Sequence, residues 1–259
     1  MPELPDVEGF RTVVAEHGTG RRVRRVDVID AGVLHGVQPR ELDRALSGRR
    51  LREPDRHGKW LLARTDGPTV MLHFGMTGDL RWSPGGEPRH RHDRVVFVTD
   101  DGELRYRDMR KLQGLRLAPD EHAVAETLAE LGPDASTVSR RQLDAMLDGR
   151  RGAVKALLMD QSVIAGLGNL LSDEILWRAG IHPRTPCRDL TPHQRDRLHR
   201  ALRGVLRASM PAGRIPPRPS WLTGVRDDPR AACPRCGTPL RRDRAAGRTT
   251  VWCPRCQPE

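Results

Sequence analysis

The chain has 259 residues, enough for one large domain or two ordinary ones with a sizeable buried core. Its net charge of +11 indicates a polyanionic partner such as nucleic acid, although an arginine-biased proteome gives the same balance, and composition leaves both interpretations open. The sequence has no apolar run of about 18 residues, which argues against a membrane-spanning helix, and few aromatic residues, which argues against nucleic-acid recognition by many stacked rings.

The first part of the chain is predicted to be a β-rich unit that opens with a helix. Apolar residues recur at helical spacing between Pro5 and Gly18, with acidic residues in the first turn. Short β-branched runs follow, separated by turn sequences such as TDG, GMTG and SPGG, which is the pattern of an antiparallel sandwich. We therefore expect an N-terminal β-sandwich domain over residues 1–117.

The apolar period becomes helical after residue 117. Helices are expected in AVAETLAEL, SRRQLDAML, VKALLMDQ and LLSDEILWRAG. Thr191, Pro192 and Gln194 supply the cap, the first-turn proline and the capping-box glutamine of a further helix. The stretch PAGRIPPRPSW is expected to be a loop. These features predict a helical domain over residues 118–226 and a small cysteine-bearing unit over residues 227–259.

The final unit carries two C-x2-C pairs separated by sixteen residues, namely Cys233, Cys236, Cys253 and Cys256. This spacing brings four thiolates within reach of one tetrahedral zinc ion, with a β-hairpin between the pairs. Disulfides are the alternative, and a cytosolic location disfavours them. Because so short a unit cannot build a core, we predict one structural Zn²⁺ that supplies its folding energy. Cys187 is unpaired and is expected to be structural.

Lysine is rare in this basic chain. Among the 45 basic residues, only Lys59, Lys111 and Lys155 are lysines. An ammonium group can give up a proton whereas a guanidinium group cannot, so these three positions are candidates for chemistry.

Several segments together resemble one protein family. PELPDVE, GMTGDLR, DMRK, LMDQSVIAGLGNLLSDEILWRAGIHP and the terminal cysteine pairs occur in the order found in the formamidopyrimidine-DNA glycosylase and endonuclease VIII family of base-excision repair enzymes. The resemblance runs from Pro2 to Gln257. It implies an α+β multidomain fold: an antiparallel β-sandwich with an opening helix, a helical domain with a helix-two-turn-helix motif, and a zinc-finger β-hairpin with four cysteine ligands.

The resemblance also implies an activity and a partner. Members of the family are DNA glycosylases with abasic-site lyase activity, and they flip the damaged nucleotide of double-stranded DNA into the protein. We expect a monomer that binds damaged duplex DNA and no membrane. No signal peptide precedes the first motif, so a bacterial-type cytoplasmic location with association to the nucleoid is expected.

Four residues match catalytic positions of the family. If Met1 is removed, Pro2 presents a secondary α-amine whose pKa of about 8 leaves a neutral fraction able to attack the deoxyribose. Glu3 matches the acid that protonates the sugar during ring opening. Lys59 matches a hairpin lysine assigned to β-elimination, and Arg248 a zinc-finger arginine that grips phosphates beside the lesion. Without the resemblance, a frayed terminus and a solvated strand-end lysine would be the default interpretations.

A second set of residues matches DNA contacts. Asn169 follows Gly-Leu-Gly at a helix start and is expected to act both as an N-cap and as a phosphate ligand. Met76, Arg110 and Leu112 correspond to the trio that fills the gap left by the flipped base, although Met76 alone would more often be a core residue. The remaining expected contacts are His92, Arg150 and Lys155.

The sequence departs from the family pattern in three places. Asp6 stands where a glutamate is usual, and DMRKLQG lacks the usual phenylalanine before its glycine. The segment between Arg214 and Cys233 is short and rich in proline, which leaves few amide donors to bind a flipped purine. We therefore expect 8-oxoguanine to be a poor substrate relative to abasic sites, ring-opened purines or oxidised pyrimidines.

Two other classes of protein share part of this pattern. A non-catalytic lesion-binding or regulatory protein could keep the same scaffold, but the presence of both Pro2 and Glu3 argues against it. A general zinc-ribbon nucleic-acid binder does not explain the opening PELPDVE.

Overall fold

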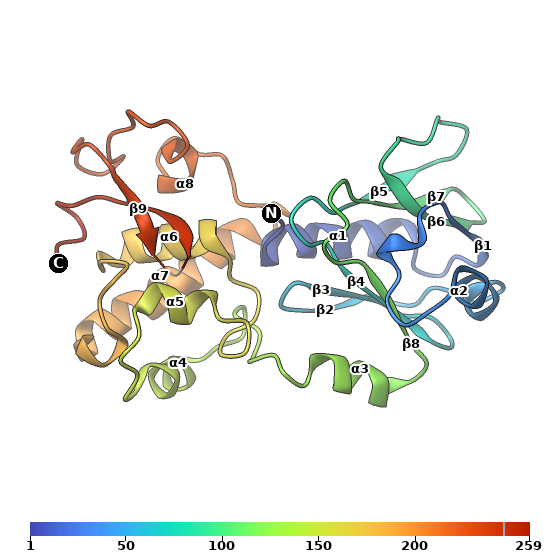
Figure 1. The fold of residues 1–259 in the computed structure, drawn as a ribbon, viewed down its shortest axis with the longest axis horizontal. Helices are drawn as coiled ribbons and strands as arrows, with labels where there is room; N and C mark the ends of the chain where they lie inside the picture. The colour runs from blue at the N-terminus through green and yellow to red at the C-terminus, as the bar shows by residue number, and fades with distance from the viewer. Residues whose placement is uncertain (246) are drawn as a thin grey trace. The chain divides into compact units, whose positions relative to one another are not determined.

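The computed structural model describes residues 1–245 and 247–259 and divides the chain into two compact units, Met1–Glu130 and Leu131–Glu259 (Figure 1). Antiparallel sheets occupy the first unit, and helices with a terminal hairpin make up the second. The expected α+β multidomain fold is confirmed. The finer boundaries after residues 117 and 226 stay predictions. Among the described residues, no helix is both long and apolar enough to cross a membrane.

The first unit is a sandwich of two four-stranded antiparallel sheets. One sheet has the order β1 (Val23–Val28), β6 (Asp93–Thr99), β7 (Glu103–Arg107), β5 (Asp79–Ser83). The other has the order β2 (Asp55–His57), β3 (Trp60–Ala63), β4 (Thr69–His73), β8 (Leu115–Ala118). Their inner faces share one apolar core, to which Leu61, Leu72, Val95 and Tyr106 contribute. Three shorter elements flank the sheets: η1 (Ala31–Val33), α2 (Pro39–Leu46) and α3 (Glu121–Leu128).

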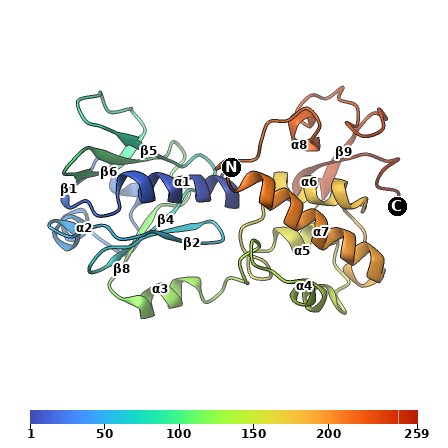
Figure 2. The ribbon, with the colours of Figure 1, turned by 180° about the vertical axis from the view of Figure 1, so that it is seen from behind.

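Helix α1 (Leu4–His17) lies along the sandwich in both ribbon views (Figures 1 and 2). It begins where proline is tolerated, since Pro5 falls in the first turn and interrupts no intrahelical hydrogen bond. Val7 and Val14, two turns apart, point into the sandwich core. The helix ends at Gly18, whose amide donates to the Val14 carbonyl at 2.8 Å. This anchoring fixes the start of the chain against the sheets.

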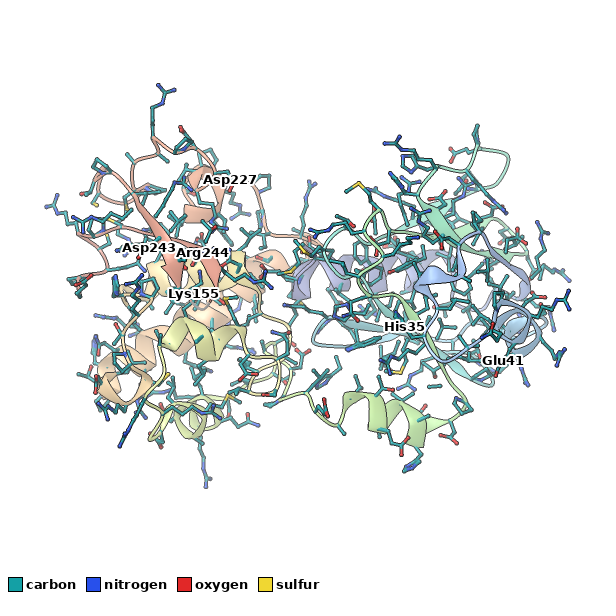
Figure 3. All side chains as sticks on the ribbon, viewed as in Figure 1. His35, Glu41, Lys155, Asp227, Asp243 and Arg244 are labelled. Carbon is teal, nitrogen blue, oxygen red and sulfur yellow. The ribbon has the colours of Figure 1, made fainter. Side chains whose placement is uncertain are left out.

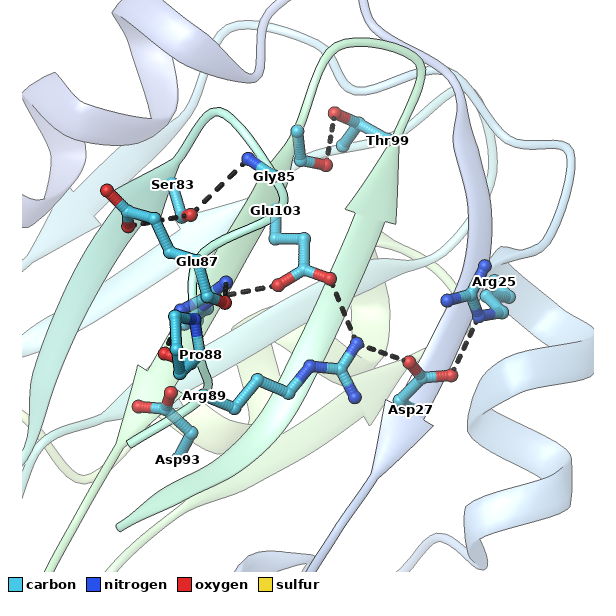
Figure 4. Close-up of polar contacts among 12 residues, drawn as sticks. Arg25, Asp27, Ser83, Gly85, Glu87, Pro88, Arg89, Asp93, Thr99 and Glu103 are labelled. Carbon is cyan, nitrogen blue, oxygen red and sulfur yellow. Dashed lines mark hydrogen bonds and ion pairs between the residues drawn. The ribbon is translucent and has the colours of Figure 1, made fainter. Parts of the chain in front are cut away.

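The connection between β5 and β6, which carries His92, is held down by a charged network (Figure 4). Arg89 from this connection donates to Asp27 on β1 at 2.6 Å and to Glu103 on β7 at 2.9 Å. Arg105 donates to two backbone carbonyl groups of the same connection at 2.9 and 3.3 Å. A long loop is thereby fixed on the sheet by guanidinium groups.

The second unit is a helical assembly around one buried helix. Its helices are α4 (Arg140–Leu147), α5 (Val154–Met159), α6 (Asn169–Ala179), α7 (Pro192–Ser209) and the short α8 (Leu222–Val225), with η2 (Cys187–Asp189) before α7. All residues of α6 from Leu171 to Trp177 are buried, and α7 packs beside it (Figures 1 and 2). The predicted start of α7 is confirmed, because Thr191 and Gln194 form the capping box.

The terminal hairpin consists of β9 (Arg241–Ala245) and β10 (Arg248–Trp252). Val251 and Cys253 are buried in a cluster with Trp177 of α6 and Leu222 of α8. The Trp177 indole donates to Cys233 Sγ at 3.3 Å. The hairpin therefore packs on α6 and α8 and adds its apolar residues to theirs.

Candidate active site and nucleic-acid interface

The start of the chain is an ordered helix entry. Pro2 is half-buried, and Glu3 is only 1% exposed. The Glu3 amide donates to the Asp6 carboxylate at 2.8 Å, one half of a capping box at the first turn of α1. Asp6, which replaces the usual glutamate, thus takes part in capping the helix. The interpretation of Pro2 and Glu3 as a frayed terminus is wrong.

A charged link connects α1 with the turn that carries Lys59. The Glu8 carboxylate on α1 accepts a hydrogen bond from Arg56 on β2 at 3.0 Å. Arg56 also donates to the Gly58 carbonyl at 3.0 Å, one residue before Lys59 in the β2–β3 turn. Although burial alone would raise the pKa of Glu8, hydrogen bonds from Arg11 and Arg56 lower it below its usual value. Arg56 was not predicted, because its partner lies 48 residues away along the chain.

His73 lies close to Lys59 and was not predicted. Its ring is 4.9 Å from that of Trp60, and its Nδ1 accepts from the Gly75 amide at 3.1 Å. Burial, and then the positive charge of Lys59, lower the pKa of His73 to about 4. The imidazole is therefore neutral at cellular pH and adds no positive charge to that of Lys59.

Two of the three predicted gap-filling residues are in contact. Arg110 donates to Met76 Sδ at 3.1 Å, and its amide donates to Thr77 Oγ1 at 3.1 Å. Leu112 is 50% exposed and is one of the few large apolar side chains on the surface of the described residues. An exposed apolar side chain on the same loop as Arg110 suits insertion into a base stack.

The loop that carries Arg110 and Leu112 is held by an ion pair. Lys111, between them, has φ of 52°, the left-handed region that a residue with a side chain rarely adopts. Its ammonium group is 3.0 Å from the Asp30 carboxylate. This pair holds a strained turn in place, so that the two flanking side chains have a defined position.

His92 is exposed on the connection between β5 and β6. Its Nδ1 lies 3.1 Å from a guanidinium nitrogen of Arg94. Desolvation, followed by the charges of Arg91 and Arg94, lowers the pKa of His92. An exposed neutral imidazole can still donate one hydrogen bond to a phosphate oxygen.

Asn169 begins α6, but it is not the N-cap. Gly168 takes the N-cap position, and the Asn169 side-chain amide donates to the Thr249 carbonyl on β10 at 3.0 Å. The N-cap prediction is therefore wrong, because the side chain bonds a strand instead of its own helix. Asn169 Oδ1 is buried with no hydrogen-bond partner in the part of the chain that the structure describes.

Lys155 is not the surface contact that we expected. The side chain, labelled in Figure 3, is 0% exposed. Its ammonium lies 2.6 Å from the Asp173 carboxylate and 2.7 Å from Thr250 Oγ1 on β10. The second Asp173 oxygen accepts from Arg226 at 2.8 Å and from the Val251 amide at 3.2 Å. Burial raises the pKa of Asp173, and the two cations oppose that shift. The group links α5, α6 and the hairpin.

Two predicted arginines remain on the surface. Arg248 is exposed at the start of β10, next to the strand residues that Lys155 and Asn169 hold. Arg150 is exposed between α4 and α5, and its carbonyl accepts from the Arg188 amide at 2.9 Å. Both guanidinium groups are accessible to phosphate.

The four predicted zinc ligands converge. The sulfur atoms of Cys233, Cys236, Cys253 and Cys256 all lie within 4.8 Å of one another. The Cys236–Cys253 separation is 3.5 Å and the Cys233–Cys256 separation 3.9 Å. Zn–S bonds of about 2.3 Å in a tetrahedron place sulfur atoms about 3.8 Å apart, so the residues fit the ion. Cys187 is buried elsewhere in the same unit.

Models of known protein families match almost the whole chain. The N-terminal domain of formamidopyrimidine-DNA glycosylase matches residues 1–115, its H2TH domain matches residues 131–216, and the zinc finger found in FPG and IleRS matches residues 232–258. Together with the sulfur geometry, the last match identifies one structural zinc ion held by the four cysteines.

Relatives and solved structures extend these matches. The formamidopyrimidine-DNA glycosylase of Geotalea uraniireducens is 38% identical over 99% of this chain and 100% of its own length. That of Symbiobacterium thermophilum is 37% identical over 100% of this chain and 90% of its own. The Lactococcus lactis enzyme, solved non-covalently bound to DNA with an abasic site, has a TM-score of 0.91 at 26% identity and covers 99% of this chain and 100% of its own. The same enzyme was solved with DNA containing Fapy-dG, with a TM-score of 0.90, 26% identity, and the same coverage.

Replacing Asp173 with asparagine should destabilise the protein strongly. The change leaves the buried Lys155 ammonium and the Arg226 guanidinium without their carboxylate, and removing one partner of a buried pair costs about 3–5 kcal/mol. Chemical denaturation should show a loss of this size. Asp189→Asn, which removes an exposed partner of Arg188, is the control and should cost less than about 1 kcal/mol. Equal losses in the two variants would contradict the assignment.

His73 should titrate far below an ordinary histidine. An NMR titration should place its midpoint at about 4, against the usual 6.5. Because the unfolded chain binds this proton first, the folded protein loses stability as pH falls from about 6.5 toward about 4. His73→Gln should reduce that acid sensitivity. A midpoint at or above 6.5 would show that the ring is not buried next to Lys59.

Proposed function

Because the chain belongs to the formamidopyrimidine-DNA glycosylase family, we propose that it excises damaged bases through a Schiff base on Pro2 and nicks the strand by elimination. It is a base-excision repair DNA glycosylase with abasic-site lyase activity. The observation that carries the mechanism is the ordered entry into α1, where half-buried Pro2 adjoins the buried Glu3.

The proposed reaction begins at the nitrogen of Pro2. Removal of Met1 exposes a secondary amine with a pKa of about 8. A fraction of this amine is therefore neutral and nucleophilic at cellular pH. The amine attacks C1′ of the deoxyribose, the bond from C1′ to the base breaks, and the base leaves with the electron pair and takes up the proton that the Pro2 nitrogen releases. Glu3 protonates the ring oxygen as the sugar opens, which yields an iminium ion between Pro2 and C1′. The iminium acidifies the C2′ protons, and loss of one expels the 3′ phosphate.

Lys59 and Arg248 are proposed to assist the elimination. The Lys59 turn is tied to α1 through Arg56 and Glu8, which supports a fixed distance between this ammonium and Pro2. Lys59 would contact a phosphate and donate a proton, a role that suits a side chain beside a neutral histidine. Arg248, exposed on the zinc-finger hairpin, would hold the phosphates flanking the lesion and act in the later elimination.

The proposed DNA contacts fall into three groups. Met76, Arg110 and Leu112 would fill the space left by the flipped base. His92, Arg150 and Asn169 would bind phosphates of the backbone. Lys155 would act indirectly, because its ammonium is buried and bonded to the β10 residue Thr250.

We also propose the setting in which the enzyme works. Its partner is double-stranded damaged DNA, in line with the DNA complexes of the Lactococcus lactis enzyme. The net charge of +11 suits binding of a polyanion without a second subunit, and a monomer is proposed. Its relatives are bacterial, which supports a cytoplasmic enzyme associated with the nucleoid.

Abasic sites, ring-opened purines and oxidised pyrimidines are proposed to be better substrates than 8-oxoguanine. The segment before Cys233 contains the short helix α8, and Trp221 at its start is 3% exposed. Trp221 is therefore packed under the loop and is not available to stack on a base. Four prolines lie between Arg214 and Cys233, which limits the amide groups that could bind a purine edge.

The mechanism predicts a covalent complex at Pro2. Borohydride should trap the protein on duplex DNA that carries an abasic site, and mass spectrometry should locate the link at the Pro2 nitrogen. Pro2→Gly, Glu3→Gln and protein that retains Met1 should each lose most trapping and cleavage. A non-catalytic lesion-binding protein would bind the same DNA and give no trapped complex. Trapping by these variants at the level of the unaltered enzyme would refute the role of Pro2.

Substrate preference can be measured with matched duplexes. The measurement is the rate of single-turnover cleavage. We expect the rate for 8-oxoguanine opposite cytosine to be lower than the rates for a formamidopyrimidine lesion, an oxidised pyrimidine and an abasic site. The physical reason is the small number of donors in the proline-rich segment. Release of 8-oxoguanine at or above the rate for the other lesions would contradict this expectation while leaving the Schiff-base mechanism intact.

A further inference from the structure

A second concentration of arginine lies at the far end of α6 from Asn169. An open hollow of about 580 Å³ is lined in part by four arginines: Arg178, Arg197, Arg200 and Arg235. Asn169 begins α6 and Arg178 lies near its end, so about 13 Å of helix separates the hollow from the proposed phosphate contact. The hollow has the size of many ligand sites, about 300–1,000 Å³.

Two of the guanidinium groups are held in position by buried indoles. Arg178 lies 4.3 Å from the ring centre of Trp221, and Arg235 lies 4.5 Å from that of Trp177. Both indoles are buried. Arg235 also donates to the Arg178 carbonyl at 3.4 Å. Stacking of this kind lowers the entropy lost when an anion binds, because the cations do not have to be immobilised.

The local charge is incompletely balanced. Arg178 is 2.7 Å from Glu174, and Arg200 is 2.7 Å from Asp196. Arg197 and Arg235 have no carboxylate within ion-pair distance among the residues that the structure describes. No acidic residue lines the hollow. Its four arginines and two carboxylate partners therefore leave a net positive charge.

Arg197 has a hydrogen-bond donor that lacks an acceptor. Its Nε is buried and has no hydrogen-bond partner in the described part of the chain. An unsatisfied buried donor costs about 1–3 kcal/mol, so a small movement of the Arg197 side chain toward an acceptor bound in the hollow would recover that free energy. An exposed arginine on a solvated helix face would not have this property, since water would satisfy it.

We propose that this hollow is a phosphate-binding site, separate from the residues assigned to catalysis. Planar guanidinium groups match phosphate oxygens with paired hydrogen bonds, and four of them from α6, α7 and the first C-x2-C loop suit two adjacent phosphates. A free polyphosphate and the backbone of a second DNA segment both present this chemistry. With DNA as the source, one molecule holds two segments at once and can pass between them.

The first experiment measures binding of inorganic pyrophosphate to the zinc-loaded protein by isothermal titration calorimetry. The double variant R197Q/R235Q should bind at least tenfold more weakly than the unaltered protein. The control is R207Q, which removes one positive charge at an exposed position of α7 outside the hollow, whereas the double variant removes two. Denaturation curves establish that the variants are folded. Absence of saturable binding, or equal weakening in the double variant and in R207Q, would overturn the proposal.

The second experiment identifies the source of the phosphate. Two undamaged duplexes with different fluorophores are mixed with the protein at low salt, and energy transfer between them reports bridging. Bridging that is lost in R197Q/R235Q and kept in R207Q assigns the site to DNA, whereas tight pyrophosphate binding without bridging assigns it to a free polyphosphate. Single-turnover cleavage at saturating enzyme should be unchanged in R197Q/R235Q. Loss of cleavage in R197Q/R235Q, with R207Q unaffected, would place these arginines in the catalytic interface and overturn the separation of the two sites.

Discussion

The Asp173 carboxylate is the interaction on which the C-terminal unit depends. It joins Lys155 of α5, Arg226 after α8 and the Val251 amide of β10 inside a region that water does not reach. A charge buried without its partners costs several kcal/mol, so these contacts form together or not at all. The zinc hairpin is too small to build its own core, and the carboxylate fixes where it docks. The exposed position of Arg248 follows from that docking.

The N-terminal unit also contains a carboxylate that is bonded by two cationic side chains. Glu8 is held ionised by Arg11 and Arg56, and Arg56 in turn binds the backbone of the turn before Lys59. The start of α1, which carries the proposed nucleophile, and the turn that carries Lys59 are therefore joined by one chain of hydrogen bonds. Precise placement of reacting groups requires such support, because a misplacement of about 1 Å can cost a large part of the rate.

The sequence predicted what local patterns determine and missed what tertiary contacts determine. Cysteine spacing, strand alternation and the Thr191 cap are short-range signals, and each predicted its element correctly. The predictions for Lys155 and Asn169 were wrong in part because their side chains bond to a hairpin some 80–95 residues away along the chain. Local sequence carries no signal of such a contact. His73 was overlooked for the same reason, since nothing in its neighbours along the chain marks it as next to Lys59.

The loop that carries Arg110 and Leu112 shows how a departure from a family pattern can be accommodated. The Lys111 backbone is left-handed, a strain of about 1–3 kcal/mol, and its ion pair with Asp30 offsets part of that cost. Gly114 closes the loop where a Cβ would lie 1.9 Å from the Val33 carbonyl, so only glycine fits there. With both ends fixed in this way, Leu112 takes the exposed position beside Arg110, and Gln113 packs against the Gly75 turn that precedes Met76. The missing phenylalanine therefore changes which apolar side chain the loop presents, but not the contacts that support the loop.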